Sequence, residues 1–347
     1  MSKKLTVILG AGASNSLNPD SKPNDHQEYR PPLAKDIFKL TSQFRAILHK
    51  YALAETLASD IDRRLKRNKN GVGLEQILKG YEQLVTDGKD TSIARQFLQI
   101  PLYLNNLFGE IGSQFTVQPD EYNNLVNLTT EKVDEVLFLT LNYDNLLEIP
   151  LSNIYGIDFS KEDHYIGQKG WYLVKLHGSI NWYRQFASSQ IDNKNDEEYL
   201  SFLRTTPLPL KLKSDFTLIS IKGYGNKYIG DIPVYPALTV PVDGKYDINC
   251  PPALHNKAKE FLSDCHNYLI IGTSGKDRDL LDLLKDNATG GKILVVGKEE
   301  ESTNKTRESF MLTIPQFQSN ISTYFHQRGF SEFVDSGELD NFLDKLV

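Results

Sequence analysis

The stretch Leu5-Thr6-Val7-Ile8-Leu9-Gly10-Ala11-Gly12-Ala13-Ser14 decides the fold of this chain. Its first five residues are mostly apolar and predict a buried strand, and a glycine-rich turn follows directly. In α/β proteins such glycines let the backbone approach a phosphate, while the next helix directs its N-terminal amides towards the anion. A tight turn that only packs a helix on a sheet has the same pattern, so the turn alone does not decide between the two.

Two further polar motifs follow apolar, strand-like runs. Asn142-Tyr143-Asp144 comes after Val136–Leu141, and His177-Gly178-Ser179 comes after Tyr172–Leu176. Ligands of open parallel sheets bind outside the carboxyl ends of the strands. We therefore expect these motifs and the glycine turn to converge on one crevice, and their side chains indicate chemistry on a dinucleotide.

Each motif has a functional and a structural interpretation. Asn142 and Asp144 can fix a ribose, an amide group or a water, but Asn and Asp are also common helix caps. His177 can take a proton from a ribose hydroxyl or a water near neutral pH, although many histidines only make structural hydrogen bonds. A later motif, Gly272-Thr273-Ser274, offers hydroxyls and an amide to a ribose or phosphate, or forms an ordinary strand-to-helix turn.

The remaining pattern predicts the architecture. Apolar residues recur at helical spacing through residues 34–128, which indicates a helical insertion after the first strand. From Val133 onwards short β-rich runs alternate with helices. This alternation predicts an α/β fold, a Rossmann-like doubly wound parallel sheet. We expect one domain over residues 1–347, with a loop-rich insertion at 185–235.

Composition narrows the classes of protein. The 347 residues are 39% hydrophobic and carry a net charge of -6, which fits a globular chain and gives no reason to expect direct nucleic-acid binding. Cys250 and Cys265 are the only cysteines, too few for a four-cysteine zinc site or a disulfide framework. No apolar run approaches the roughly 20 residues of a membrane span. A cytoplasmic location without membrane association is the simplest expectation.

Taken in order, the motifs resemble the sirtuin superfamily. That family has a Gly-Ala-Gly-x-Ser loop, then Thr-x-Asn-x-Asp, His-Gly and Gly-Thr-Ser. The counterparts here are residues 10–14, Thr140 to Asp144, His177-Gly178 and Gly272 to Ser274. The resemblance covers residues 4–14 and about 133–300.

Two departures separate the chain from protein-deacylating sirtuins. It lacks their two Cys-x-x-Cys zinc pairs, and Val240-Pro241-Val242 stands where they have Phe-Gly-Glu. This combination is similar to the sirtuin-like NAD-degrading effectors of bacterial anti-phage defence. The resemblance implies a hydrolase that takes NAD as substrate and cleaves its nicotinamide–ribose bond, giving nicotinamide and ADP-ribose, without a metal ion.

The resemblance also assigns roles to residues. Asn142 would orient the water and the ribose, Asp144 would hold the carboxamide or the loop, and His177 would be the base. The remaining positions would contact the cofactor along its pyrophosphate and adenosine ribose: Gly10, Ala11, Gly12, Ala13, Ser14, Thr140, Gly272, Thr273 and Ser274.

Free NAD cleavage would harm the host cell, so this resemblance also implies control. We expect a homo-oligomer or an operon-encoded partner: a helicase-like ATPase, an Argonaute-type protein or a nucleotide-processing enzyme. The helical block 34–128 is the expected contact surface, unless it only caps the sheet, and the polar loop Asn15–Tyr29 is the expected switch. Two other classes stay open: an NAD-dependent deacylase or ADP-ribosyltransferase, and a non-catalytic nucleotide sensor.

Overall fold

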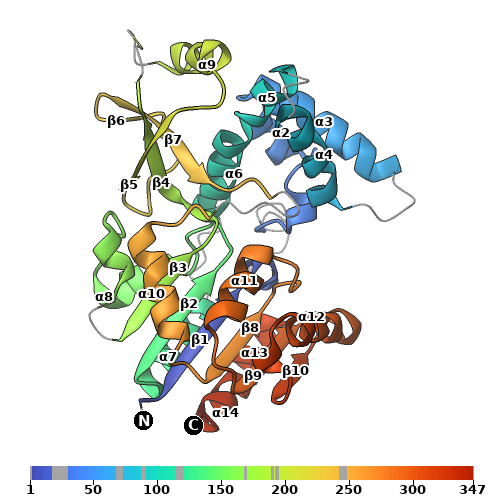
Figure 1. Cartoon of the computed structure of the whole chain (residues 1–347), viewed down its shortest axis with the longest axis vertical. Coiled ribbons are helices and arrows are strands. Elements are labelled where there is room, and N and C mark those ends of the chain that lie inside the picture. Colours follow the sequence, from blue (N-terminus) through green and yellow to red (C-terminus); the bar gives the residue numbers. More distant parts are fainter. Residues whose placement is uncertain are drawn as a thin grey trace.

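A parallel sheet of six strands forms the centre of the computed structural model (Figure 1). The structure describes residues 2–17, 30–67, 73–86, 91–114, 120–167, 170–188, 191, 195–241 and 248–346. The strand order is β10-β9-β8-β1-β2-β3. The strands are β1 Lys4–Leu9, β2 Glu135–Thr140, β3 Trp171–Lys175, β8 Asn267–Ile271, β9 Lys292–Gly297 and β10 Ile321–Phe325.

The direction of winding reverses beside β1. Strand β1 pairs in parallel with β2 on one side, Val7 opposite Phe138, and with β8 on the other, Val7 opposite Leu269. The chain therefore builds β2 and β3 on one side of β1, and later β8, β9 and β10 on the other. A ligand crevice forms at such a point, beyond the carboxyl ends of the two central strands.

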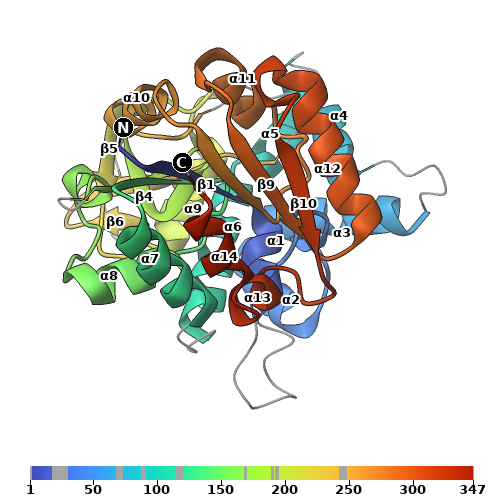
Figure 2. The ribbon, with the colours of Figure 1, turned by 90° about the horizontal axis from the view of Figure 1, so that it is seen from below.

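Helices cover both faces of this sheet, which confirms the doubly wound α/β prediction (Figure 2). One face carries α10 Pro252–Leu262, α11 Arg278–Asn287 and α12 Glu300–Thr313; the other carries α7 Asp120–Lys132, α8 Glu148–Tyr155, α13 Phe330–Asp335 and α14 Glu338–Asp344. Because both faces are covered, the central strands are apolar along nearly their whole length. Leu5, Val7, Ile8 and Leu9 of β1 are fully buried.

A second body of structure lies beyond the carboxyl ends of the parallel strands (Figure 1). It is an antiparallel sheet in the order β5-β4-β7-β6, packed with helices that follow β1 in the chain. The strands are β4 Gly178–Phe186, β5 Leu212–Leu218, β6 Tyr228–Ile229 and β7 Ile232–Leu238. The helices are α2 Ser42–Leu48, α3 Ala52–Arg67, α4 Leu74–Thr86, α5 Thr91–Phe97 and α6 Ile100–Gln114. The short helix α1, Ala11–Ser16, belongs to the glycine turn and packs in the core of the parallel sheet.

The region 185–235, expected as a loop-rich insertion, contains helix α9, Asp196–Thr205, strands β5 and β6 and the beginning of β7. The acidic residues 196–198 form the first turn of α9, and Asn195 caps this helix: its Oδ1 accepts a hydrogen bond from Glu198 N at 2.8 Å. Most of the expected switch loop Asn15–Tyr29 lies outside the described residues, as does Val242. Among the described helices, none is long and apolar enough to cross a membrane.

Candidate functional site

The glycine turn after β1 packs against the turn after β8. Gly10 N donates to Ile271 O at 2.9 Å, and Gly12 N donates to Gly272 O at 2.8 Å. A Cβ atom on Gly12 would lie 2.7 Å from Gly272 O, and one on Gly272 only 2.0 Å from Ala13 N. These glycines are therefore required first for the contact between two turns, and this contact brings Gly272, Thr273 and Ser274 beside residues 10–14.

Asn142 joins the end of β2 to the same glycine turn. Its Nδ2 donates to Gly10 O at 3.2 Å and to Ser14 Oγ at 3.1 Å, and Ser14 Oγ also shares a 3.0 Å hydrogen bond with Tyr122 OH. Ser14 is fully buried and does not cap α1, whose N-cap is Gly10. Both donors of the Asn142 amide are thus used, and within the described residues no donor reaches its buried Oδ1. That oxygen is therefore a buried acceptor without a partner among the described residues.

Thr140 and Asp144 serve the local backbone. Thr140 Oγ1 donates to Leu9 O at 3.2 Å and accepts from Asn142 N at 3.1 Å. Asp144 Oδ1 accepts from Leu146 N at 3.2 Å, the turn-stabilising role of an Asp before a helix. Burial raises the Asp144 pKa, although the Lys175 charge opposes that shift. With 5% of its surface exposed, Asp144 is placed to hold the loop rather than to meet a ligand directly.

A buried ion pair between Lys175 and Glu148 supports the loop that carries Asn142 and Asp144, and the sequence analysis did not predict it. Lys175 Nζ lies 2.7 Å from Glu148 Oε1, and both side chains are 1% exposed. The same ammonium donates to the backbone oxygen of Asp144 and, at 3.5 Å, to that of Tyr143. The available signal was a charged residue inside each of two apolar runs, since charges are seldom buried unless paired.

Hydrogen bonds connect the His177 turn to the Asn142 loop. His177 O accepts from Thr239 N at 3.0 Å, and Thr239 O accepts from Tyr143 OH at 2.6 Å. The imidazole Nε2 lies 3.2 Å from Asp277 Oδ2 and 3.6 Å from Asp279 Oδ2. Both aspartates begin α11, and Asp277 also caps that helix by accepting from Leu280 N at 2.9 Å.

The two aspartates change the chemistry of His177. Burial alone would lower its pKa, but the hydrogen bonds and charges of Asp277 and Asp279 outweigh burial and raise the pKa to about 9. Conversely, burial pushes the Asp277 pKa up, while the imidazole and the Leu280 amide bring it down below its ordinary value. At neutral pH the pair is therefore an imidazolium held by carboxylates. The sequence analysis did not predict a role for Asp277 in the site, because an Asp at the start of a helix is explained by capping alone.

The same cluster has the composition of a metal site. His177, Asp277 and Asp279 each offer one ligand atom, and these atoms lie within 4.8 Å of one another. A divalent cation there would have to displace a proton from Nε2, because only the neutral imidazole binds metals. The two cysteines take no part in this cluster. Both are buried, and Cys265 Sγ accepts a hydrogen bond from Thr6 Oγ1 and donates one to Asn267 O.

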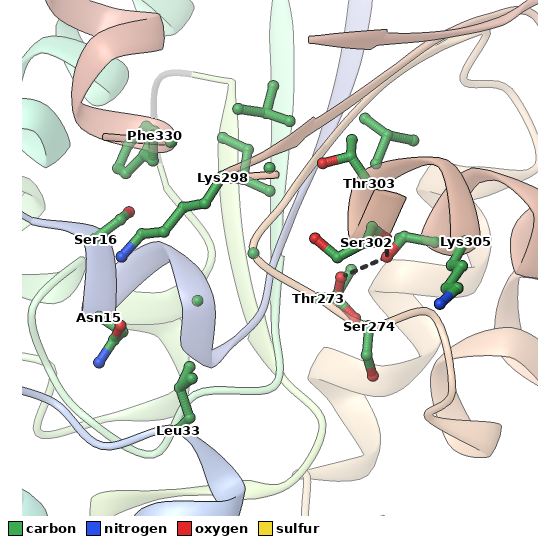
Figure 3. A pocket seen from close by; sticks show the side chains of 18 of the residues that line it. Asn15, Ser16, Leu33, Thr273, Ser274, Lys298, Ser302, Thr303, Lys305 and Phe330 are labelled. Carbon is green, nitrogen blue, oxygen red and sulfur yellow. Dashed lines mark hydrogen bonds between the residues drawn. The ribbon is translucent and has the colours of Figure 1, made fainter. Parts of the chain in front are cut away.

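An open cleft of about 350 Å³ lies over the carboxyl ends of β8 and β9 (Figure 3). Of the predicted cofactor positions, Gly12, Gly272, Thr273 and Ser274 line it. Asn142, Asp144 and His177 do not line it; of these three, Asn142 is joined by its hydrogen bond to Gly10 O to the glycine turn beside the cleft. The four predicted motifs are thus brought together, but the open space lies on the Thr273–Ser274 side.

Comparison with known proteins assigns the family. The model of the SIR2-like domain matches residues 136–324, more than half of the chain, so the protein belongs to the SIR2-like family. A search of the curated proteins found no match. The match to the SIR2-like domain confirms the resemblance of the sequence motifs to sirtuins.

Solved structures of Sir2 proteins are similar over nearly the whole chain. A Sir2 homologue in complex with NAD has 10% identity and a TM-score of 0.41, covering 99% of this chain and 91% of its own. A mutant Sir2 homologue in complex with ADP-ribose has 14% identity and a TM-score of 0.42; the match covers 99% of this chain and 93% of the homologue. A structure describing the mechanism and regulation of Sir2 enzymes has 14% identity and a TM-score of 0.38; the match covers 99% of this chain and 94% of that protein.

Proposed function

We propose that this chain is an NAD glycohydrolase, which cleaves the nicotinamide–ribose bond of NAD to give nicotinamide and ADP-ribose. Membership of the SIR2-like family supports an NAD-using enzyme. The observation that carries the finer proposal is the unpaired Oδ1 of Asn142, a buried acceptor held by two fixed donor contacts. Buried polar atoms normally have partners, so this oxygen is suited to a water or a ribose hydroxyl.

The reaction needs positioning and charge stabilisation. The bond to nicotinamide breaks with its electron pair, nicotinamide leaves as a neutral molecule, and the ribose passes through an oxocarbenium-like state. A water held by Asn142 Oδ1 then adds to the ribose carbon that carried nicotinamide, and this water loses a proton. Lys175 and Glu148 hold the loop that carries Asn142, which fixes the amide in one place.

His177 is the proposed acceptor of the proton. With a pKa of about 9, only about one imidazole in a hundred is neutral at pH 7, so base catalysis by His177 strengthens as the pH rises. Asp277 and Asp279 then stabilise the imidazolium that forms. Asp144 acts as a positioning residue through the loop, and Gly12, Thr273 and Ser274 are proposed to contact the cofactor in the cleft.

The cellular role we propose is that of an effector in anti-phage defence, whose activity depends on assembly. This part rests on the motif resemblance and on the toxicity of NAD loss. The partner would be another copy of the chain or an operon-encoded protein. The helices α2–α6, which lie beyond the carboxyl ends of the parallel sheet, are the proposed contact surface.

One assay tests the reaction. The protein is incubated with NAD, with and without its operon neighbours and an acylated peptide, and nicotinamide, ADP-ribose and acyl-ADP-ribose are followed. The proposal predicts equal amounts of nicotinamide and ADP-ribose without any peptide. Nicotinamide release only with an acylated peptide would identify a deacylase, and binding without product would identify a sensor; either result overturns the proposal.

A further inference from the structure

The cleft over β8 and β9 is lined by cations without a carboxylate. Its charged lining residues are Lys276, Lys298 and Lys305. Lys305 forms an ion pair with Glu301 on its own helix, and both side chains are mostly exposed. Within the described part of the chain, Lys298 has no such partner. The cleft therefore offers more positive charge than its own structure balances.

Lys298 holds a distinctive position. It directly follows Gly297, the last residue of β9, and its side chain extends across the cleft towards Asn15 and Ser16 of α1 (Figure 3). Arg30 is held beside the same edge, where its guanidinium donates to Asn15 O. Burial lowers the pKa of Lys298, and the neighbouring charge of Arg30 lowers it further. The charge of Glu121 offsets part of the Arg30 charge, and an anion bound beside Lys298 would relieve the remaining repulsion between the two cations.

The topology indicates which part of a dinucleotide would meet Lys298. Strand β8, the Gly272 turn, helix α11 and strand β9 form one βαβ unit, and β8 and β9 are paired in parallel. In dinucleotide-binding units of this kind, the residue at the end of the second strand contacts the adenosine ribose. A carboxylate there binds the 2′-hydroxyl, and a cation accommodates a 2′-phosphate. This chain has Lys298 at that position.

We propose that Lys298, supported by Arg30, forms a subsite for a phosphate on the adenosine ribose, so that the chain binds NADP more tightly than NAD. The inference rests on the proposed function, because it assumes a dinucleotide in this cleft. Ser302 also lines the cleft, but its hydroxyl donates to Glu299 O at 3.1 Å, so the subsite rests on the two cations. The charge-assisted contacts to a phosphate are strong enough for a preference of about tenfold or more.

Binding of the cleaved products tests the subsite without interference from turnover. Isothermal titration compares ADP-ribose with ADP-ribose 2′-phosphate on the full chain. The wild type should bind the phosphorylated ligand about tenfold more tightly. Lys298→Ala should bring the two affinities within about twofold of each other, and Lys298→Glu should favour ADP-ribose. Lys285→Ala, an exposed lysine on α11 outside the cleft, is the matched control and should keep the wild-type preference.

The outcomes separate this inference from the proposed function. Equal binding of the two ligands by the wild type, or an unchanged preference in Lys298→Ala, overturns the phosphate subsite and leaves the glycohydrolase proposal standing. Failure of both ligands to bind overturns both. Loss of the preference in Lys285→Ala as well would show a general charge effect and would also overturn the subsite.

Discussion

The Nε2 atom of His177 lies 3.2 Å from Oδ2 of Asp277, the residue that caps helix α11. The contact joins the end of β3 to the beginning of α11, from opposite sides of β1 in the sheet. It couples the protonation of the proposed base to a carboxylate that also holds a helix in place. The contact therefore determines the pH at which His177 becomes neutral.

The first prediction concerns this pH dependence. If His177 is the base, kcat/KM for NAD cleavage should rise with pH, reach half its maximum near pH 9 and level off above that, because the neutral imidazole is the active form. In Asp277→Asn one of the two supporting charges is lost and Asp279 remains, so the rise should move to lower pH, in the direction of the ordinary histidine value of about 6.5. Asp282→Asn, an exposed change on the same helix, is the control. An identical rise in wild type and Asp277→Asn would contradict the coupling.

The second prediction concerns the contact between the two glycine turns. Gly272→Ala places a Cβ 2.0 Å from Ala13 N at a φ of +66°, so we expect a loss of more than about 2 kcal/mol in the free energy of unfolding. Gly156→Ala is the matched control: its φ is +69° but no described atom lies within 4 Å of the added Cβ. It should cost only about 1–2 kcal/mol, the cost of a left-handed backbone for an L-residue. Urea unfolding measures both, and equal losses would show that crowding at the turns is unimportant.

The third prediction concerns the buried Lys175–Glu148 pair. Lys175→Met leaves a buried carboxylate without its partner, which typically costs about 3–5 kcal/mol at neutral pH. Burial raises the Glu148 pKa, and that rise should be larger without Lys175. The variant should therefore recover stability as the pH falls and Glu148 becomes protonated. Combining Lys175→Met with Glu148→Gln should restore most of the loss at pH 7. No recovery at low pH or in the double variant would contradict this explanation.

The centre of the parallel sheet could be predicted because its central strands are buried on both faces. The runs Leu5–Leu9 of β1 and Val136–Leu139 of β2 are nearly all apolar, and both are buried. The antiparallel sheet was harder to predict, since β4 mixes polar and aromatic residues and begins directly at Gly178. Its partner strands are separated from it along the chain by α9, so no local pattern indicates the pairing.

The site could be predicted in part. Residues at strand ends converge by topology, which is why Gly10, Asn142 and Gly272 were accessible from the motifs. The roles of Asp277 and Lys298 could not be predicted from the sequence, because these roles depend on which turns and helices become neighbours in space. A helix cap and a lysine after a strand are ordinary features until the structure places His177 and Arg30 beside them.

The fourth prediction concerns control by assembly. NADase activity per chain should be low at high dilution and should rise with protein concentration or with the operon partner, because a partner acts by favouring the active state. Activity measured over a dilution series, alongside the mass of the particles in solution, checks this. Full activity of the dilute monomer would contradict control by assembly and leave the reaction itself unaffected.

The most direct test of the account is NAD cleavage by Asn142→Ala. The substitution removes the unpaired Oδ1 and both Nδ2 contacts, so we expect kcat to fall by about 10²–10³-fold or more while the protein stays folded by circular dichroism. Asn341→Ala, an exposed change on α14, is the control and should keep wild-type activity. Normal turnover by a folded Asn142→Ala variant would contradict the proposed role of Asn142 and, with it, the proposed site.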